Sequence, residues 1–253
     1  MSFAGKVVLI TGASSGIGAA TAIHLAKQGA SLSITGRNKD NLNKVAAQCG
    51  QSKTLIVTGE LTVENDVKNI IEQTIKHYGK LDVLVNNAGC LENGSIESTS
   101  LEQYDKIFNL NVRSVYQLTM LATPYLVATK GNIVNVSSVT GIKSFPGILA
   151  YCMSKSAVDQ LTRCVALELA GKQVRVNAVN PGVIVTNLHH TSGMNDEQLK
   201  NFFEHSGKTH ALGRVGKPEE VAKTIAFLAS KDASFITGAT LPVDGGRHAM
   251  CPR

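Results

Sequence analysis

The sequence predicts an α/β fold, a single-domain doubly wound parallel sheet with helices on both faces. Short runs rich in β-branched residues alternate along the chain with longer segments in which apolar residues recur at helical spacing. The strand-like runs are almost continuously apolar, as expected of strands that are buried on both faces. Because no linker, internal repeat or low-complexity tract divides the 253 residues, we expect one domain over 1–253.

The predicted elements follow one another in βαβ order. The first apolar run, residues 6–11, leads through a glycine-rich loop into helical spacing at 17–28. The same spacing recurs at 67–78 and at 151–169. The remaining strand-like runs are residues 31–36, 53–58, 82–86, 132–137, 174–180 and 240–243. The least regular stretch, 187–214, interrupts the alternation with a turn and a helical segment at 196–205, and we expect it to be a lid over the substrate.

The composition argues against several kinds of protein. No apolar stretch approaches the roughly 20 residues of a membrane-spanning helix, and the first strand begins too early to leave room for a signal peptide. The five cysteines lack CxxC spacing and the histidines lack acidic or cysteine partners at ligand spacing, so neither a disulfide framework nor a metal site is predicted. The net charge of +6 is spread without a basic block, which does not favour nucleic-acid binding. We expect a soluble cytoplasmic protein.

The loop after the first strand, Thr11-Gly-Ala-Ser-Ser-Gly-Ile-Gly18, predicts a dinucleotide site. Its glycines permit a tight turn and let a pyrophosphate approach backbone N–H groups at the start of a helix, where the helix dipole is positive. The spacing is GxxxGxG instead of the common GxGxxG, so ordinary turn glycines are the alternative. The candidate cofactor residues of this loop are Gly12, Ser14, Ser15, Gly16, Ile17 and Gly18.

The end of the second strand indicates which cofactor is used. In dinucleotide-binding folds an acidic residue at this place binds the ribose 2′-OH of NAD. Here the residue is Arg37, whose planar and permanently charged guanidinium suits a 2′-phosphate. The sequence therefore favours NADP(H), although a solvent-exposed arginine is the simpler alternative.

Further motifs complete a pattern: Asn86-Asn-Ala-Gly89, Asn111, Ser138, Tyr151-x-x-x-Lys155 and Pro181-Gly182. With the glycine loop and Arg37, they make the sequence resemble the short-chain dehydrogenase/reductase family from end to end. The resemblance implies a Rossmann-type sheet of seven strands, hydride transfer from the B face of nicotinamide, and commonly a homotetramer, with a homodimer as the alternative.

The resemblance also assigns cofactor contacts beyond the glycine loop. It places Asn87, Ala88 and Gly89 beside the fourth strand and the adenine side, and it places Pro181, Gly182, Ile184 and Thr186 at the nicotinamide, with Thr186 on the carboxamide. Glu60 stands where the family usually has an aspartate that touches the adenine amine, so Leu61 is the alternative contact through its backbone.

Tyr151 and Lys155 are the predicted proton-transfer pair. Four residues separate them at the start of a helical segment, so both side chains share one face. A tyrosine has a pKa of about 10, and we expect the Lys155 ammonium to lower it so that Tyr151 can give or take the proton of the reacting oxygen. Tyr151 and Lys155 are also both expected to contact the cofactor.

Two further residues complete the predicted catalytic set. Ser138 precedes Tyr151 by 151 − 138 = 13 residues, the family's usual interval, and its hydroxyl would hold the substrate oxygen. Asn111 matches the family asparagine that bends its helix and holds a water next to the lysine, with Asn109 as the competing assignment.

The substrate is less well specified by the sequence. Expected around the carbonyl site are Leu91, Ile142, Phe145, Pro146, Ile148 and Leu149, an apolar set without an obvious clamp for a carboxylate. This apolar set favours a lipophilic ketone or alcohol. The overall pattern, including the tail at 241–248, resembles invertebrate members labelled 3-oxoacyl-carrier-protein-reductase-like, some of which reduce steroid or isoprenoid carbonyls. A steroid or ecdysteroid-like ketone, a retinoid or an isoprenoid is therefore preferred. Because the lid holds His189, His190, Lys200 and Lys208, a 3-oxoacyl thioester of acyl-carrier protein is the second hypothesis.

Two features of the sequence allow a different interpretation. A dinucleotide-binding regulator without turnover is the hypothesis of another class, and the intact set of Asn111, Ser138, Tyr151 and Lys155 argues against it.

An apolar stripe on the 151–169 helix fits either an interface between subunits or the core of one chain. It consists of Val158, Leu161, Val165 and Leu169.

Overall fold

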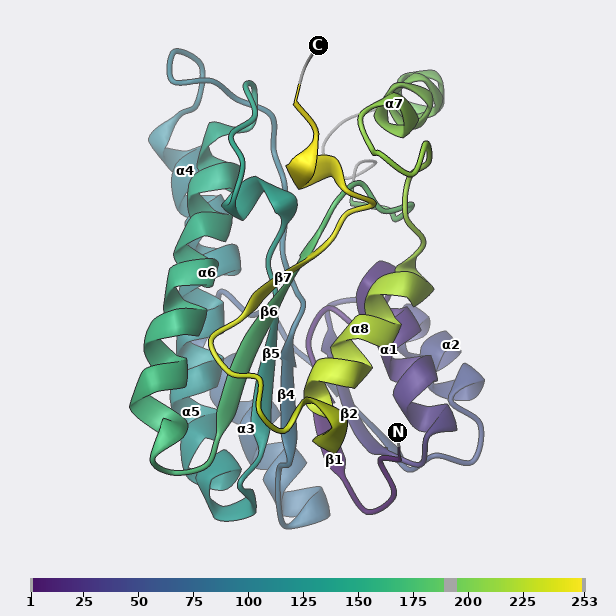
Figure 1. Cartoon of the computed structure of the whole chain (residues 1–253). Helices are drawn as coiled ribbons and strands as arrows, with labels where there is room; N and C mark the ends of the chain where they lie inside the picture. The colour runs from purple at the N-terminus through teal and green to yellow at the C-terminus, as the bar shows by residue number, and fades with distance from the viewer. Residues whose placement is uncertain (1, 189–194, 252–253) are drawn as a thin grey trace.

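The computed structural model describes residues 2–188 and 195–251 (Figure 1). Its strands are β1 (Val7–Ile10), β2 (Ser31–Gly36), β3 (Thr54–Thr58), β4 (Val83–Asn86), β5 (Asn132–Val136), β6 (Arg175–Pro181) and β7 (Thr240–Val243). Its helices are α1 (Gly16–Lys27), α2 (Lys39–Gln48), α3 (Glu64–Tyr78), α4 (Leu101–Phe108), α5 (Ser114–Thr129), α6 (Leu149–Ala170), α7 (Asp196–Lys208) and α8 (Pro218–Ala229). Each of the seven predicted strands is present, with limits that differ by no more than one residue.

The strands form one parallel sheet in the order β3-β2-β1-β4-β5-β6-β7. After β3 the chain crosses to the other side of β1, so the strand order reverses between β1 and β4. In sheets of this type a ligand binds at the carboxyl ends of the strands where the order reverses. The predicted single-domain, doubly wound α/β fold with seven strands is confirmed.

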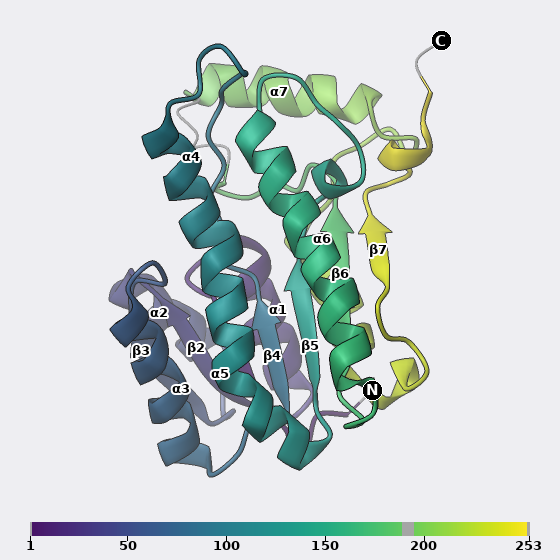
Figure 2. The same cartoon turned by 90° about the vertical axis from the view of Figure 1, so that its left-hand side faces the viewer.

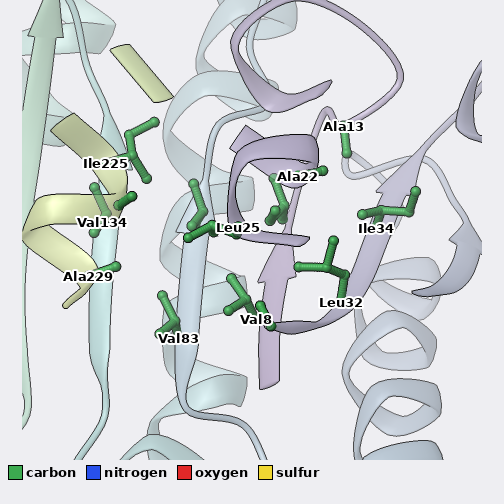
Figure 3. Packing of buried hydrophobic residues seen from close by; sticks show 14 of the residues in the cluster. Val8, Ala13, Ala22, Leu25, Leu32, Ile34, Val83, Val134, Ile225 and Ala229 are labelled. Atoms are coloured by element: carbon green, nitrogen blue, oxygen red, sulfur yellow. The ribbon is translucent and has the colours of Figure 1, made fainter. Parts of the chain in front are cut away.

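Helices cover both faces of the sheet. Helices α1, α2 and α8 lie on one face, and α3, α4, α5 and α6 lie on the other (Figures 1 and 2). In the first layer, Val8 of β1 lies against Leu25 of α1, and Val134 of β5 lies against Ile225 of α8 (Figure 3). These side chains are fully buried, which removes their apolar surface from water at about 25 cal/mol per Å² and fixes the strands relative to the helices.

The apolar stripe on α6 belongs mainly to the core of this chain. Val158 and Leu169 are buried, and Val165 packs against the cluster that joins α3, α5 and α6 to the sheet. Of the two interpretations left open by the sequence, the structure favours the intramolecular one. Among the described residues, no helix is long and apolar enough to cross a membrane.

A π-helical turn joins α4 to α5. The turn η1 (Asn109–Arg113) continues the helix with a wider backbone ring, a feature that often occurs at functional sites. It directs Asn111 into the interior, where that side chain is fully buried, whereas Asn109 stays exposed. The placement agrees with Asn111 as the residue that bends the helix.

A buried carboxylate ties the amino-terminal edge of the sheet together. Asp82 accepts hydrogen bonds from the Lys6 ammonium at 2.8 Å and the Val7 N–H at 2.9 Å, and it pairs with Lys80 at 2.9 Å. Burial alone would raise the pKa of Asp82, but these donors hold its pKa below the usual value. The loop before β4 is thereby joined to the start of β1.

We predict that Asp82→Asn lowers the free energy of unfolding by about 1–3 kcal/mol at pH 7, because a buried, charge-assisted network loses its anion. The contribution of a carboxylate with a lowered pKa is present above about pH 4 and disappears as the pH falls through its folded-state pKa. Urea unfolding at pH 7 and in acid should therefore show a difference between the variants that shrinks in acid. Asp105→Asn, an exposed site on α4, is the control; an equal loss there would contradict the assignment.

Candidate active site

A cavity of about 1050 Å³ opens at the carboxyl edge of the sheet, where the strand order reverses. Its wall consists of the loops after β1 to β6, part of α7 and the C-terminal turn η4 (Arg247–Ala249). Both α7 and that turn lie over this edge (Figures 1 and 2). The predicted residues found in the wall are Gly12, Ser14, Ser15, Gly16, Ile17, Arg37, Glu60, Leu61, Asn87, Ala88, Gly89, Ser138, Tyr151, Lys155, Pro181, Gly182, Ile184 and Thr186.

Gly18 and Asn111 lie outside the wall, in the layer behind it. A β-carbon at Gly18 would collide with the Gly12 carbonyl, so Gly18 allows close packing of α1 under the loop. Asn111 instead binds the loop that follows β4. Its side-chain amide donates to the Cys90 carbonyl at 2.9 Å and accepts from the Cys90 N–H at 2.9 Å. It also donates to the Ser154 hydroxyl at 3.0 Å. Both residues therefore contact groups that support the wall.

The glycine loop has the geometry of an anion cradle. Gly12 has a φ of +61°, and a β-carbon there would stand 2.9 Å from Ala88, so the turn accepts only glycine without strain. The α1 N-cap, Ser15, makes no side-chain capping bond, which leaves backbone N–H groups of the first turn available. Their direction and the helix dipole suit a pyrophosphate. The donor set fits a dinucleotide.

Asn87 holds this loop against the end of β4. Its side-chain amide donates to the carbonyls of Thr11 at 2.8 Å and Gly12 at 3.2 Å. The backbone N–H groups of Asn87 and Ala88 both donate to the Thr11 hydroxyl at 3.0 Å. The Asn87 amide is therefore committed to positioning the glycine loop.

Arg37 lies at the mouth of the cavity and faces Glu60. Its side chain is 77% exposed, and its guanidinium stands 3.5 Å from the Glu60 carboxylate. Exposed ion pairs of this kind contribute about 0–1 kcal/mol, so the pair can separate at small cost. Two residues with separate predicted roles, one at the 2′-phosphate and one at adenine, are thus neighbours.

Tyr151 and Lys155 lie side by side at the inner end of the cavity. Tyr151 is 6% exposed and Lys155 is 4% exposed. The Lys155 ammonium lies 5.6 Å from the centre of the tyrosine ring and donates to the Val136 carbonyl at 2.9 Å. The four-residue spacing on one helix therefore brings the two groups together as expected.

Burial governs the protonation of both groups. It raises the pKa of Tyr151 to about 12, and a hydrogen bond with Ser138 opposes that rise. It lowers the pKa of Lys155 to about 8, and the negative charge of Asp159 opposes that fall. The expectation that Lys155 lowers the pKa of Tyr151 is therefore not met by the chain alone, because burial of the phenol outweighs the hydrogen bond with Ser138. At neutral pH Tyr151 is a phenol that can donate.

No sequence motif indicated Asp159. It lies on α6 four residues after Lys155, which itself lies four residues after Tyr151, so the three side chains share one face of the helix. It is 1% exposed and accepts from the Asn180 amide at 2.9 Å. The same Asn180 amide donates to the Ser138 carbonyl at 2.9 Å. Burial raises the pKa of Asp159, while hydrogen bonds with Ser137 and Asn180 oppose the rise. Its i, i+4 position relative to Lys155 was the available signal.

The far side of the cavity has an apolar lining with charged residues among it. Leu91, Phe145, Pro146 and Ile148 line it as expected, whereas Ile142 and Leu149 lie outside its wall. Sequence patterns did not indicate the ion pair of Glu92 with Lys106, nor the presence of Phe202 and Arg247 in this wall. These residues come from four separate parts of the chain, so no local motif announces them.

The expected lid is described only in part. Residues 189–194, with His189 and His190, lie outside the described residues. Asn187, Leu188 and Phe202 of the flanking parts line the cavity. His210 does not line it: this buried ring accepts from the Val183 N–H at 3.1 Å and lies 2.6 Å from the Ser206 carbonyl. It connects the end of α7 to the loop after β6.

Comparison with known proteins identifies the family. Residues 12–248 match a family model described as enoyl-(acyl carrier protein) reductase. The chain is 39% identical to 3-oxoacyl-(acyl-carrier-protein) reductase of Thermotoga maritima over 251 residues, which cover 97% of this chain and 99% of that protein. The chain belongs to the short-chain dehydrogenase/reductase family. It is thus an oxidoreductase of carbonyl and alcohol groups that uses a nicotinamide dinucleotide.

Other relatives share the fold and differ in substrate. The chain is 40% identical to meso-2,3-butanediol dehydrogenase of Serratia marcescens over 249 residues, covering 98% of this chain and 97% of that protein. A short-chain dehydrogenase/reductase of unknown function from Caenorhabditis elegans, solved with cofactor, superimposes with a TM-score of 0.93 at 38% identity; the match covers 98% of this chain and 97% of that one. Relatives of nearly equal identity to this chain are thus named for different substrates.

The lowered pKa of Lys155 predicts how the free energy of unfolding of this dehydrogenase/reductase depends on pH. Between pH 8 and about 10.5 the unfolded chain binds the lysine proton and the folded chain does not, so the stability of wild type relative to Lys155→Met should rise with pH. We expect that difference to grow by about 2–3 kcal/mol from pH 7 to pH 10. Urea titrations of both proteins measure it, and groups common to both cancel. A difference that does not change with pH would contradict the lowered pKa.

Proposed function

We propose that the chain is an NADP(H)-dependent oxidoreductase that interconverts a carbonyl and an alcohol on a lipophilic substrate. The observation that carries the proposal is the buried Tyr151 hydroxyl, hydrogen-bonded with Ser138, beside Lys155, in a cavity that continues to the glycine loop. A proton donor, a group for the substrate oxygen and a dinucleotide cradle thus share one cavity.

The residues of the cavity wall would hold the cofactor along the carboxyl edge. The pyrophosphate fits the start of α1, and the adenosine end would lie along the part of the wall that Arg37, Glu60, Leu61 and Ala88 line. Thr186 stands next to Gly16, where a β-carbon on the glycine would be 3.1 Å from its methyl group. Pro181, Gly182 and Ile184 continue this side toward Tyr151, as a nicotinamide requires. When bound, the nicotinamide supplies or accepts the hydride.

The protein residues then handle the proton. In reduction the Tyr151 phenol donates its proton to the substrate oxygen, and the Ser138 hydroxyl stabilises charge on that oxygen. The nearby Lys155 ammonium favours the phenolate that remains, because an opposite charge stabilises the ionised form. Asn111 holds the backbone at Cys90, and its amide oxygen and the Lys155 ammonium lie 3.1 and 3.5 Å from a β-carbon placed on Gly89, which supports the proposal that Asn111 holds a water next to the lysine. Oxidation uses the same groups in reverse.

The apolar part of the wall supports a lipophilic substrate. Leu91, Phe145, Pro146 and Ile148 line the cavity together with Tyr151, and Asn187, Leu188 and Phe202 of the expected lid also line it. Steroid, ecdysteroid-like, retinoid and isoprenoid carbonyls are the classes we favour. From the family resemblance we infer a homo-oligomer, tetrameric or dimeric; exposed Tyr116 and Met120 on α5 support it.

The second candidate is reduction of 3-oxoacyl thioesters. The relative from Thermotoga maritima and the description of the family model support it. Oxidation of NADPH with acetoacetyl thioesters, compared with steroid ketones, retinal and isoprenoid aldehydes, distinguishes the two candidates. A lack of turnover with all of them while NADPH binds would favour the regulator.

We predict that Tyr151→Phe abolishes most turnover and largely keeps NADPH binding, because the change removes the transferable proton and leaves the ring. Loss of a general acid reduces rates by about 10²–10⁴-fold. Steady-state kinetics and NADPH fluorescence titration measure the two properties, and Tyr125→Phe on α5 is the control. Retention of wild-type turnover in the Tyr151 variant would remove this assignment.

We predict that Arg37→Asp shifts the ratio of kcat/KM values from NADPH toward NADH, because a carboxylate repels the 2′-phosphate and can bind a ribose hydroxyl. The neighbouring carboxylate makes a second variant informative. Glu60→Gln should increase the preference for NADPH, since it leaves Arg37 without a competing anion. An unchanged preference in the Arg37 variant would exclude the phosphate role.

A further inference from the structure

The C-terminal turn brings a guanidinium to the substrate end of the cavity. Arg247 lies in η4, which sits over the carboxyl edge of the sheet (Figures 1 and 2). It lines the same cavity as Ser138 and Tyr151. Its guanidinium carbon lies 4.7 Å from the centre of the Phe145 ring, so the turn and the loop after β5 meet through this contact.

The other cations of the cavity wall already have partners. Arg37 faces Glu60 at 3.5 Å, and Lys106 pairs with Glu92. Lys155 donates to the Val136 carbonyl and belongs to the proton-transfer pair. Each of these three charges therefore already has a partner within the chain or a proposed role toward the cofactor or the proton.

Arg247 has no such partner within residues 2–188 and 195–251, where no carboxylate forms an ion pair with it. Asp244 is close enough to influence its charge, but the Asp244 oxygens accept from the His248 N–H at 2.6 Å, the His248 ring at 2.9 Å and the Gly246 N–H at 3.1 Å. That carboxylate is used to close the turn. The donors of the half-buried guanidinium are therefore available to the cavity.

We infer that Arg247 binds an anionic oxygen group of the substrate, a carboxylate or a phosphate, carried away from the reacting carbonyl. This inference rests on the proposed function and gives its substrate a more definite class. A guanidinium stacked on a ring keeps the donors at its edge, and their fork matches two oxygens of an anion. Partial burial removes competing water, which strengthens the attraction.

The surroundings specify the rest of the molecule. Leu91, Pro146 and Ile148 provide an apolar wall in the cavity that also holds Tyr151 and Arg247. A substrate with a carbonyl, a hydrocarbon segment and an acidic group satisfies all three regions. Four residues of the apolar set predicted from the sequence line this cavity, and the C-terminal turn adds to them a cation that the sequence pattern did not indicate.

The test compares probes that differ in charge. In the first pair the anionic probe is oxooctanoate, with the keto group next to the terminal methyl group and the carboxylate at the other end of the chain. Its neutral partner is the methyl ester of the same acid. The other pair is acetoacetyl-coenzyme A, which carries phosphates, against the acetoacetyl thioester of N-acetylcysteamine. The kcat/KM ratio of anionic to neutral probe is measured with NADPH for wild type, Arg247→Gln and Lys172→Gln. Lys172 is exposed beyond the end of α6, so the control removes one positive charge outside the cavity.

We expect wild type to prefer the anionic member of at least one pair, and we expect Arg247→Gln to reduce that ratio by about 10- to 100-fold, as loss of a charge-assisted hydrogen bond does. Lys172→Gln should keep the ratio. The pair that responds identifies the anion as carboxylate or phosphate. No anionic preference in wild type, or the same ratio in Arg247→Gln, overturns the inference.

A binding measurement separates this inference from the reductase function. Octanoate and octyl phosphate, which carry the two anions on the same hydrocarbon chain, are each titrated calorimetrically into wild type and Arg247→Gln with NADPH present. If no probe is reduced, the proposed activity fails on these substrates, and the two ligands together still decide the role of Arg247. Binding of either ligand to wild type that weakens about tenfold or more in the variant supports the role. For both ligands, equal dissociation constants or no binding to wild type overturn it.

Discussion

The ammonium of Lys155 is a charge that the fold holds out of water, and the active site depends on it. Isolated charges in a protein interior are unfavourable, so the surrounding chain must supply the missing hydration. The Val136 carbonyl accepts one hydrogen bond, and the Asp159 carboxylate one turn along α6 adds an opposing charge. Because Asp159 also accepts from Asn180, whose amide donates to the Ser138 carbonyl, one buried network supports both the lysine and the serine.

The same constraint explains the layer behind the cavity. A buried lysine near Tyr151 requires the chain after β4 to pass close by, and a β-carbon at Gly89 would stand 3.5 Å from the ammonium and 3.1 Å from the Asn111 amide oxygen. Asn111 reaches Cys90 from the π-helical turn, whose wider backbone turns that side chain inward. On the other side, Asn87 and Thr11 join this strand end to the glycine loop. Hydrogen bonds of the chain after β4 thus connect the glycine loop, where we propose the cofactor, with the neighbourhood of Tyr151 and Lys155.

Local patterns predicted what depends on local chain geometry. The strands follow from apolar runs, the glycine loop from a turn that Gly12 can adopt, and the Tyr151–Lys155 pair from helical spacing. Quantities set by packing were not predicted. The pKa of Tyr151 rises because distant segments close over its hydroxyl, and Glu60 meets Arg37 because β2 and β3 are adjacent in the sheet. The sequence around Asp159 does not indicate its role, because its partner Asn180 comes from β6 and reaches Asp159 only in the folded chain.

The substrate end was the least predictable part for the same reason. The glycine loop, Ser138 and Pro181 follow strand ends, whereas Tyr151 and Lys155 lie on α6, so the sheet and the helix packed on it place these residues whatever the loops contain. Residues that face the rest of the substrate come from the loop after β5, from α7 and from the C-terminal turn, which meet only in the folded chain. Phe145 and Arg247 are 102 positions apart by 247 − 145 = 102, yet they are in contact. Since no strand fixes such contacts, they can change without disturbing the reaction, and relatives with the same fold can accept an acyl thioester in one protein and a diol in another.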